Sequence, residues 1–207
     1  TRYDVRAEDN GFEVALAARC VSAAVDYAWT GRVTGGPGAR LVVEVQGRAR
    51  RAFASPRIGL NLLLGAELGG REFRSRMVSG SVRTRVFPRE IAEERWGYGD
   101  WFTALDYDLG GLKVAACLEG GHAGIEDQRN FCDSSYKVYA YLPHAFPNLA
   151  HGDTARQVLT FTVSGKPRWR KPAAPPAPAV IRIGKAIPGS RMPRVTPSPS
   201  VGSPASG

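Results

Sequence analysis

The chain has 207 residues with ordinary apolar content, which suffices for one domain with a sizeable core and is too little for two large ones. No run of about eighteen apolar residues occurs, so we expect no membrane-spanning segment. The net charge of +9 at first suggests nucleic acid, but residues 166–207 carry eight Lys or Arg and no acid. Of the 28 basic residues, 20 therefore remain in residues 1–165, against 19 acidic ones. This nearly neutral part has no overall electrostatic footprint for nucleic acid, so we expect no nucleic-acid partner.

Composition divides the chain into two zones. Residues 1–165 have the composition of a folded domain, whereas residues 166–207 hold ten of the fifteen prolines and end in "PSPSVGSPASG". Such a segment cannot bury enough apolar surface to offset the entropy of ordering it, so we predict a linker or disordered tail there. The first residues, "TRYDVRAEDN", contain neither an initiator Met nor a signal-peptide pattern, and we expect the chain to be a fragment.

The first zone has the pattern of β-strands in chain order. Apolar and polar residues alternate over 11–20 and 39–47, and "RIGLNLLL" at 57–64 is a nearly continuous apolar run. The pattern continues over 79–87, 101–109, 112–120, 136–142 and 156–163. "LGGLKV" at 109–114 predicts a tight hairpin, and only "PREIAEERW" at 88–96 favours a short helical turn. Many strands without intervening helices indicate an antiparallel sandwich or barrel, and we predict an all-β fold, an antiparallel β-sandwich.

The three cysteines, Cys20, Cys117 and Cys132, have no regular spacing and do not indicate a disulfide framework. The apolar neighbours of Cys20 and Cys117 lead us to interpret these two as reduced core residues, which fits a cytoplasmic protein. No nucleophile elbow of the form G-x-S-x-G and no phosphate-binding loop is present. The three histidines lie in unrelated contexts, so we predict neither a metal site nor a cofactor.

The stretch "GIEDQRNFCDSSYKVY" at 124–139 is unusually polar between apolar strands. On a continuous strand, Glu126, Gln128 and Asn130 would share one face, and Asp127, Arg129 and Phe131 the other. A turn at "CDSS" would then return Lys137 to the same region, so that two carboxylates, a guanidinium and an ammonium could surround one small polar molecule. The alternative is a solvated edge hairpin whose charges pair with one another, and spacing alone slightly favours it.

This stretch also resembles the signature of the D-apionate lactonase family, which has a Glu-Asp-Gln-Arg-Asn-aromatic-x-Asp-x-Ser-aromatic-Lys run. Other landmarks follow in the same order: "RIGLNLL" at 57–63, "FPREI" at 87–91, "LEGG" at 118–121 and "PHAFPNLAHGD" at 143–153. Two departures occur. Leu64 and Gly65 stand where the family usually has His-Pro, and Phe131 stands where it usually has Trp.

The resemblance implies a β-rich domain that precedes a TIM-barrel domain, in an enzyme that opens D-apionolactone to D-apionate in bacterial pentose catabolism. "RMPRV" at 191–195 resembles the entry to that barrel, after which the chain becomes rich in Pro, Ser and Gly, so we infer that the barrel is missing. The expected partners are thus a small sugar lactone and a TIM-barrel domain.

Lactone hydrolysis needs an activated water and a stabilised oxyanion, and the resemblance together with residue type suggests the groups. Glu126 and Asp127 are candidates for the catalytic general base. Arg129 and Lys137 could neutralise the developing charge or hold the product carboxylate, and Asn130 and Asp133 could bind sugar hydroxyls. Two alternatives stay open: a non-catalytic β-sandwich module that binds carbohydrate or supports a neighbouring domain and, ranked last, a glycosidase with paired carboxylates.

Overall fold

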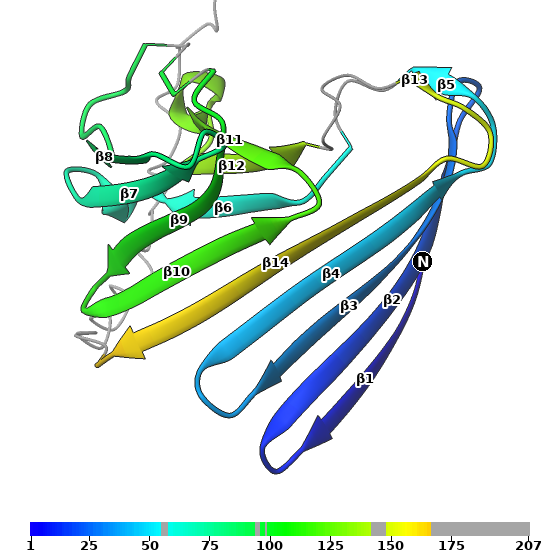
Figure 1. Cartoon of the computed structure of the whole chain (residues 1–207), viewed down its shortest axis with the longest axis horizontal. Coiled ribbons are helices and arrows are strands. Elements are labelled where there is room, and N and C mark those ends of the chain that lie inside the picture. Colours follow the sequence, from blue (N-terminus) through cyan, green and yellow to red (C-terminus); the bar gives the residue numbers. More distant parts are fainter. Residues whose placement is uncertain (55–57, 94–95, 98, 142–147, 167–207) are drawn as a thin grey trace, which may run out of the picture. The chain divides into compact units, whose positions relative to one another are not determined.

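The computed structural model describes residues 1–54, 58–93, 96–97, 99–141 and 148–166 (Figure 1). These residues belong to one compact unit, Thr1–Trp169. Of the predicted tail at 166–207, residues 167–207 lie outside the described residues, and the boundary at 165/166 remains a prediction. Within the described part, no helix has the length and apolar character needed to cross a membrane.

Antiparallel strands and two short 3-10 helices make up the regular structure of the described residues. The elements are β1 (Arg2–Glu8), β2 (Gly11–Val21), β3 (Asp26–Gly36), β4 (Arg40–Ala49), β5 (Phe53–Ala54), β6 (Asn61–Gly65), η1 (Ala66–Leu68), β7 (Glu72–Met77), β8 (Val82–Val86), β9 (Phe102–Leu109), β10 (Leu112–Glu119), β11 (His122–Asp127), η2 (Gln128–Phe131), β12 (Ser135–Tyr141), β13 (Asn148–Leu149) and β14 (Thr154–Gly165). The predicted all-β, antiparallel fold is confirmed.

Apart from β5 and β13, which pair with each other in a small separate sheet, the strands form two layers. The large layer has the order β1-β2-β3-β4-β14-β10-β9, and β9 also pairs with β7, which pairs with β8. The small layer consists of β11, β12 and β6, and it joins the large layer through the single pair Ala123↔Phe102. Figure 1 shows β6 passing behind β9. The sheet therefore turns a corner at Phe102 and folds over itself, which gives the predicted sandwich its two layers.

The main core lies between these layers. Leu105, Val114 and Leu118 contribute from the large layer, and Ile125 and Val138 from the small one, all of them buried. Alternation along each strand explains this, because every second residue of β10 and β12 from Leu112 and Tyr136, and Ala123 and Ile125 of β11, are apolar and point to the same side, which Asp127 shares at the end of β11. The other face of β11 and β12 is consequently available for polar groups.

The large layer extends beyond the small one. On β1 to β4 the face that continues the core side remains apolar, but much of it is only partly buried, and Tyr3, Val5 and Phe12 are exposed. At one end of these strands, a small cluster of described residues around Tyr27 and Phe53 is buried.

The predicted tight hairpin at 109–114 is confirmed. The β9–β10 hairpin turns at Gly110 and Gly111, both with positive φ (62° and 93°), as a tight turn requires. The predicted helical turn is wrong. No helix forms in the described part of 88–96, because the carbonyls of this segment are engaged by side chains from η2.

The interpretation of the cysteines is corrected as well. All three are free and exposed, whereas Cys20 and Cys117 were expected in the core. Cys20 lies at the partly covered end of β2, and Cys117 points to the side of β10 away from the core. An apolar sequence context therefore did not identify the covered face at Cys117, whereas Cys20 shares the face of the buried Tyr27 but is itself exposed.

Candidate functional site

The β11–β12 hairpin is internal to the sheet. β12 lies between β11 and β6, and β11 contacts β9 at the corner. Glu126 is only 9% exposed and Asp127 only 2%. The alternative of a solvated edge hairpin is therefore wrong. Buried charges in this position must be paired or hydrogen-bonded.

The strand ends earlier than its alternation predicted. β11 stops at Asp127, and residues 128–131 form the 3-10 helix η2. The Asp127 carboxylate accepts a hydrogen bond from the Arg129 backbone N–H and caps this helix. Cys132 follows in the left-handed conformation (φ 62°) and ends it. Gln128, Asn130 and Phe131 consequently do not lie on strand faces, which corrects the expected division of the stretch into two faces.

Asp127 and Arg129 form a buried clamp. Arg129 donates to both Asp127 oxygens, from Nε to Oδ1 (2.8 Å) and from Nη2 to Oδ2 (2.7 Å). Its guanidinium also donates to the carbonyl oxygens of Pro88, Arg89 and Glu90, at 2.8, 2.8 and 2.9 Å. The clamp thereby ties the segment after β8 to the hairpin.

Further contacts support the same clamp. The backbone N–H of Ala92 donates to Asp127 Oδ2 (3.0 Å), so each carboxylate oxygen accepts at least two hydrogen bonds. The Arg129 guanidinium lies 4.9 Å above the Tyr136 ring, and the Tyr136 hydroxyl donates to the Pro88 carbonyl (2.6 Å). These saturated contacts suit a structural group better than a base that must accept a proton from water.

The clamp also determines the ionisation of its members. Burial raises the pKa of the Asp127 carboxyl, but the hydrogen bonds from Arg129 and Ala92 outweigh burial, and the pKa lies below its ordinary value of 3.8. The hydrogen bond to Asp127 raises the pKa of Arg129. Burial raises the pKa of the Tyr136 hydroxyl. The pair is therefore fully ionised at neutral pH.

A second cluster lies on the opposite face of the hairpin, which we call the outer face. Glu126 and Lys137 are directly opposite in the β11–β12 register, and Lys137 Nζ lies 2.5 Å from Glu126 Oε1. Gln128 Nε2 also donates to Oε1 (2.7 Å). Within the described part of the chain, no hydrogen bond or ion pair engages Glu126 Oε2. One carboxylate oxygen is thus fixed while the other retains its accepting capacity.

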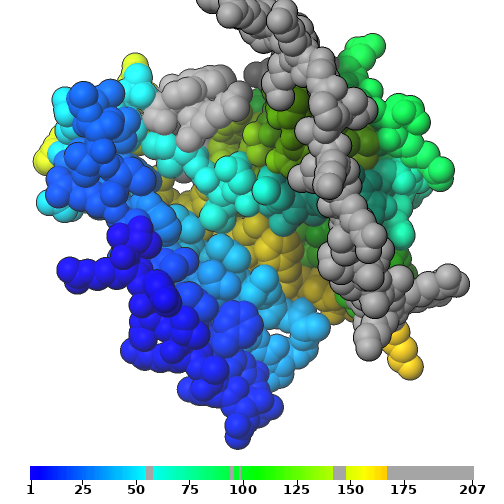
Figure 2. Space-filling model, turned by 180° about the vertical axis from the view of Figure 1, so that it is seen from behind, coloured from blue at the N-terminus to red at the C-terminus, as the bar shows by residue number. Residues whose placement is uncertain are grey.

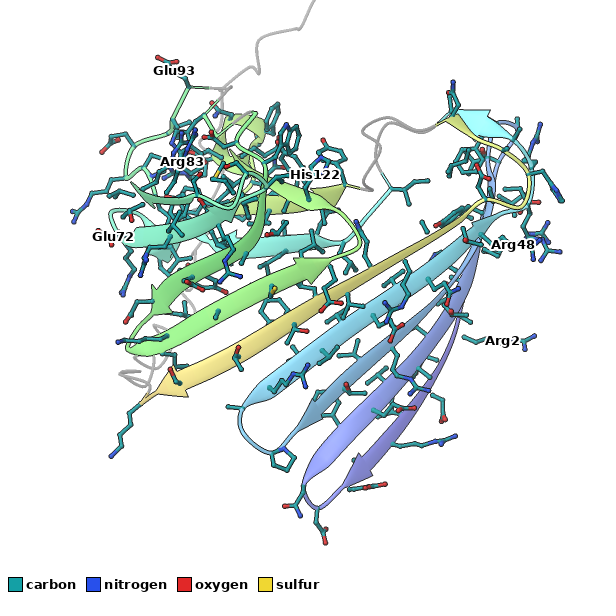
Figure 3. All side chains as sticks on the ribbon, viewed as in Figure 1. Arg2, Arg48, Glu72, Arg83, Glu93 and His122 are labelled. Carbon is teal, nitrogen blue, oxygen red and sulfur yellow. The ribbon has the colours of Figure 1, made fainter. Side chains whose placement is uncertain are left out.

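An aromatic group continues the outer face beyond this ion pair. Trp101 makes edge contacts with His122 (4.8 Å between ring centroids), Tyr139 (6.3 Å) and Tyr141 (5.4 Å). Tyr139 and Tyr141 lie on the same face of β12 as Lys137, and His122 lies on the same face of β11 as Glu126 (Figure 3 labels His122). Burial lowers the pKa of the His122 imidazole, so it is neutral at pH 7.

Gly124 makes room for this group. It lies between His122 and Glu126 on β11, and an added Cβ would meet the Tyr139 ring at 2.8 Å. Nearby, the hydroxyl of Ser135 is buried, with the residue 6% exposed, and has no hydrogen-bond partner among the described residues. The outer face therefore combines a charged pair, a buried hydroxyl and aromatic edges.

The remaining predicted residues lie at the end of the hairpin. Asn130 is exposed and donates to the Ala92 carbonyl (2.9 Å), and Asp133 is exposed and accepts a hydrogen bond from the Ser134 backbone N–H (2.5 Å). The structure thus brings Glu126 and Lys137 together on one face and Asp127 and Arg129 on another, and all six do not converge on one pocket. Sequence reasoning missed Trp101, His122 and Tyr141. Of these three, only Tyr141 could have been found in the sequence, because it alternates with Lys137 and Tyr139 along one strand.

These features define an all-β sandwich domain with a polar and aromatic face on its smaller layer. The sequence model described as "D-apionate lactonase, N-terminal domain" matches residues 1–166. The chain belongs to this family. No curated protein matches the sequence.

Several solved structures are similar. Galactose 1-epimerase from Lactobacillus acidophilus NCFM is 7% identical with a TM-score of 0.48, and the match covers 79% of this chain and 66% of that one. The Slr1438 protein from Synechocystis sp. PCC 6803 is 9% identical (TM-score 0.45, with 79% and 66% covered). A GalM/aldose epimerase homologue from C. elegans is 11% identical (TM-score 0.43, with 80% and 69% covered). The chain spans about two thirds of the length of these proteins.

Proposed function

We propose that this chain is the N-terminal domain of a sugar-acid lactonase that hydrolyses D-apionolactone to D-apionate, and that the outer face of β11 and β12 carries its polar site. Membership of the family supports the substrate class. The observation that carries the site is the partly buried Glu126–Lys137 pair beside the aromatic group around Trp101. Aromatic surfaces bind the apolar faces of sugars, while fixed polar groups select their hydroxyls.

The chemistry assigns a role to each member of the pair. Glu126 removes a proton from a water molecule through Oε2 as the water oxygen attacks the lactone carbonyl carbon. The Lys137 ammonium stabilises the oxyanion of the tetrahedral intermediate. Collapse of the intermediate breaks the ring C–O bond, and the proton on Glu126 passes to the leaving alkoxide, which gives the hydroxy acid and restores the carboxylate.

The clamp has a different role in this proposal. Asp127, an initial candidate for the base, has both oxygens engaged, and Arg129 has its guanidinium bound to Asp127 and three carbonyls. We therefore assign these two residues to positioning η2 and the 88–92 segment. Asn130 and Asp133 are exposed and remain the proposed contacts for sugar hydroxyls. The other proposed partner is a following TIM-barrel domain, which supplies groups of its own.

Carboxylate release from D-apionolactone, followed by pH-stat titration, tests this proposal on the purified chain beside a full-length family member. We expect Glu126→Gln to reduce turnover by about 10²–10⁴-fold in whichever form is active. Glu119→Gln, an exposed carboxylate at the end of β10, serves as the matched control and should leave turnover unchanged. Equal turnover in the Glu126→Gln variant and the parent would eliminate the assignment.

A second candidate is a carbohydrate-binding or supporting module without catalysis. The observation that favours it is the direct pairing of Glu126 with Lys137, because a water molecule that Glu126 activates must bind beside this ion pair. Such a module would bind aldonolactones, as measured by calorimetric titration, and Trp101→Ala would abolish this binding. In the full-length family member, Glu126→Gln would leave turnover unchanged.

A further inference from the structure

The strand β1 has one unpaired edge. On one side it pairs with β2 along its whole length, from Arg2↔Ala17 to Glu8↔Gly11. On its other side, no strand of the described residues pairs with it, and all seven of its residues are exposed. Figures 1 and 2 show this dark blue strand at the border of the sheet. The free N–H and C=O groups of such an edge are a template for another strand.

The charges on β1 alternate in sign along one face. Arg2, Asp4, Arg6 and Glu8 point to one side of the sheet, while Tyr3, Val5 and Ala7 point to the apolar side. The only ion pair within this set joins Arg6 Nε and Asp4 Oδ2 (3.2 Å), and both side chains are largely exposed. Figure 3 shows the Arg2 side chain extending away from the sheet. Charges that merely block association do not need alternating signs.

We propose that β1 pairs with β1 of a second copy of this chain, antiparallel, about a two-fold axis at Val5. In this register Arg2 lies opposite Glu8 of the partner subunit, and Asp4 lies opposite Arg6 of the partner subunit. Because the two-fold axis repeats each contact, the ladder contains four cross-strand pairs of opposite charge. Such an isologous contact closes and gives a dimer rather than a fibre.

The charge pattern specifies this register against its neighbours. A shift of two residues places Arg2 opposite the partner's Arg6 and Asp4 opposite the partner's Asp4, so that like charges meet. A shift of two in the other direction does the same with Arg6 and the partner's Arg6. A shift of one residue moves the apolar side chains to the charged face. The register centred on Val5 therefore places opposite charges together on one face and apolar side chains together on the other, along the full strand.

The apolar side of β1 is matched in the same arrangement. Val5, 57% exposed, lies opposite Val5 of the partner subunit, and Tyr3, 76% exposed, lies opposite Ala7 of the partner subunit. The apolar faces of β1 to β4 in the two copies become continuous across the axis. Directly opposite side chains in an antiparallel pair approach closely enough to cover one another.

Sedimentation equilibrium of the purified chain over a concentration series tests the proposal. We expect a monomer–dimer equilibrium that weakens as salt increases. Asp4→Arg places two arginines opposite each other on both sides of the axis and should weaken the dimer by about tenfold or more. The double variant Asp4→Arg with Arg6→Asp exchanges the charges within the strand and should restore the dimer.

A matched control and a mixing experiment complete the test. Asp9→Arg makes the same charge change in the turn after β1 and should leave association unchanged. A variant with Asp4→Arg and Glu8→Arg and another with Arg2→Glu and Arg6→Glu should each be monomeric, and their mixture should form a heterodimer. A parent chain that stays monomeric up to about 1 mM, or a dimer that Asp4→Arg leaves intact, would overturn the proposal.

Discussion

Arg129 donates to both carboxylate oxygens of Asp127 in a parallel, two-point ion pair that is shielded from solvent. The same guanidinium holds three consecutive carbonyl groups of the segment after β8. The polar residues of the hairpin end thus hold a segment about forty residues away in place.

Removal of one clamp partner should be costly. Arg129→Met leaves the Asp127 carboxylate buried without a counter-charge, and we expect a loss of about 3–5 kcal/mol in the free energy of unfolding. Arg156→Met breaks the exposed pair with Glu44 and should cost about 1 kcal/mol or less. Urea denaturation followed by circular dichroism measures both, and equal losses in the two variants would contradict the clamp.

The clamp should also make stability depend on acid. The pKa of Asp127 in the folded chain lies below its ordinary value of 3.8, so the ionised carboxylate favours folding above that value. As the pH falls through the folded-state pKa, the carboxylate takes up a proton and this stabilisation is lost. In Asp127→Asn the same acidification should remove less stability than in the parent. Denaturation midpoints of the parent and the variant should be compared at neutral pH and at about pH 3. An equal fall of the midpoint in both proteins would contradict the prediction.

Gly124 should be necessary for the position of Tyr139. In Gly124→Ala the new methyl group meets the Tyr139 ring at 2.8 Å, so the ring must move, and we expect a destabilisation of about 1–3 kcal/mol. Gly36→Ala on β3 is the control, because the nearest atom to its added Cβ is 3.9 Å away. Thermal unfolding compares the two, and near-UV circular dichroism should change only in Gly124→Ala. An unchanged aromatic signal in that variant would show that the ring has space to spare.

Cys132 should be replaceable by glycine with a gain in stability. Its backbone is in the left-handed region (φ 62°), where a side chain is unfavourable by about 1–2 kcal/mol. Cys132→Gly relieves this cost, partly offset by the greater freedom of glycine in the unfolded chain. Cys117→Gly makes the same change within β10 and should destabilise instead. Calorimetric midpoints that shift downward in both variants would contradict the expected difference.

Alternation of apolar residues predicted most of the strands, but not their covered faces. β2, β4, β9, β10, β12 and β14 were all expected from period two, because alternation is a local property of the chain. β1, β3 and β7 were missed: glycines interrupt the alternation in β3 and Ser75 interrupts it in β7, whereas β1 alternates strictly over Arg2–Glu8. Cys117 shows the limit clearly: the side of a strand that is covered depends on which distant strands pack on it.

The candidate site was only partly predictable for a similar reason. Glu126 and Lys137 were expected near each other, since a hairpin brings them together. The different hydrogen-bonding of Glu126 and Asp127 was not expected. It depends on Ala92 and on the carbonyls of Pro88 to Glu90, about forty residues away in the chain. Trp101 enters the outer face from a third segment, and local spacing carries no information about that contact.

Glu126 is the residue on which the proposed hydrolysis depends most directly. Initial rates of D-apionolactone hydrolysis should be measured for the parent, Glu126→Gln and Asp127→Asn, in the purified chain and at the matching positions of a full-length family member. We expect Glu126→Gln to reduce kcat per folded molecule by about 10²–10⁴-fold, and Asp127→Asn to lower stability more than the rate per folded molecule. A Glu126→Gln variant that turns over the lactone at the parental rate would contradict the central claim.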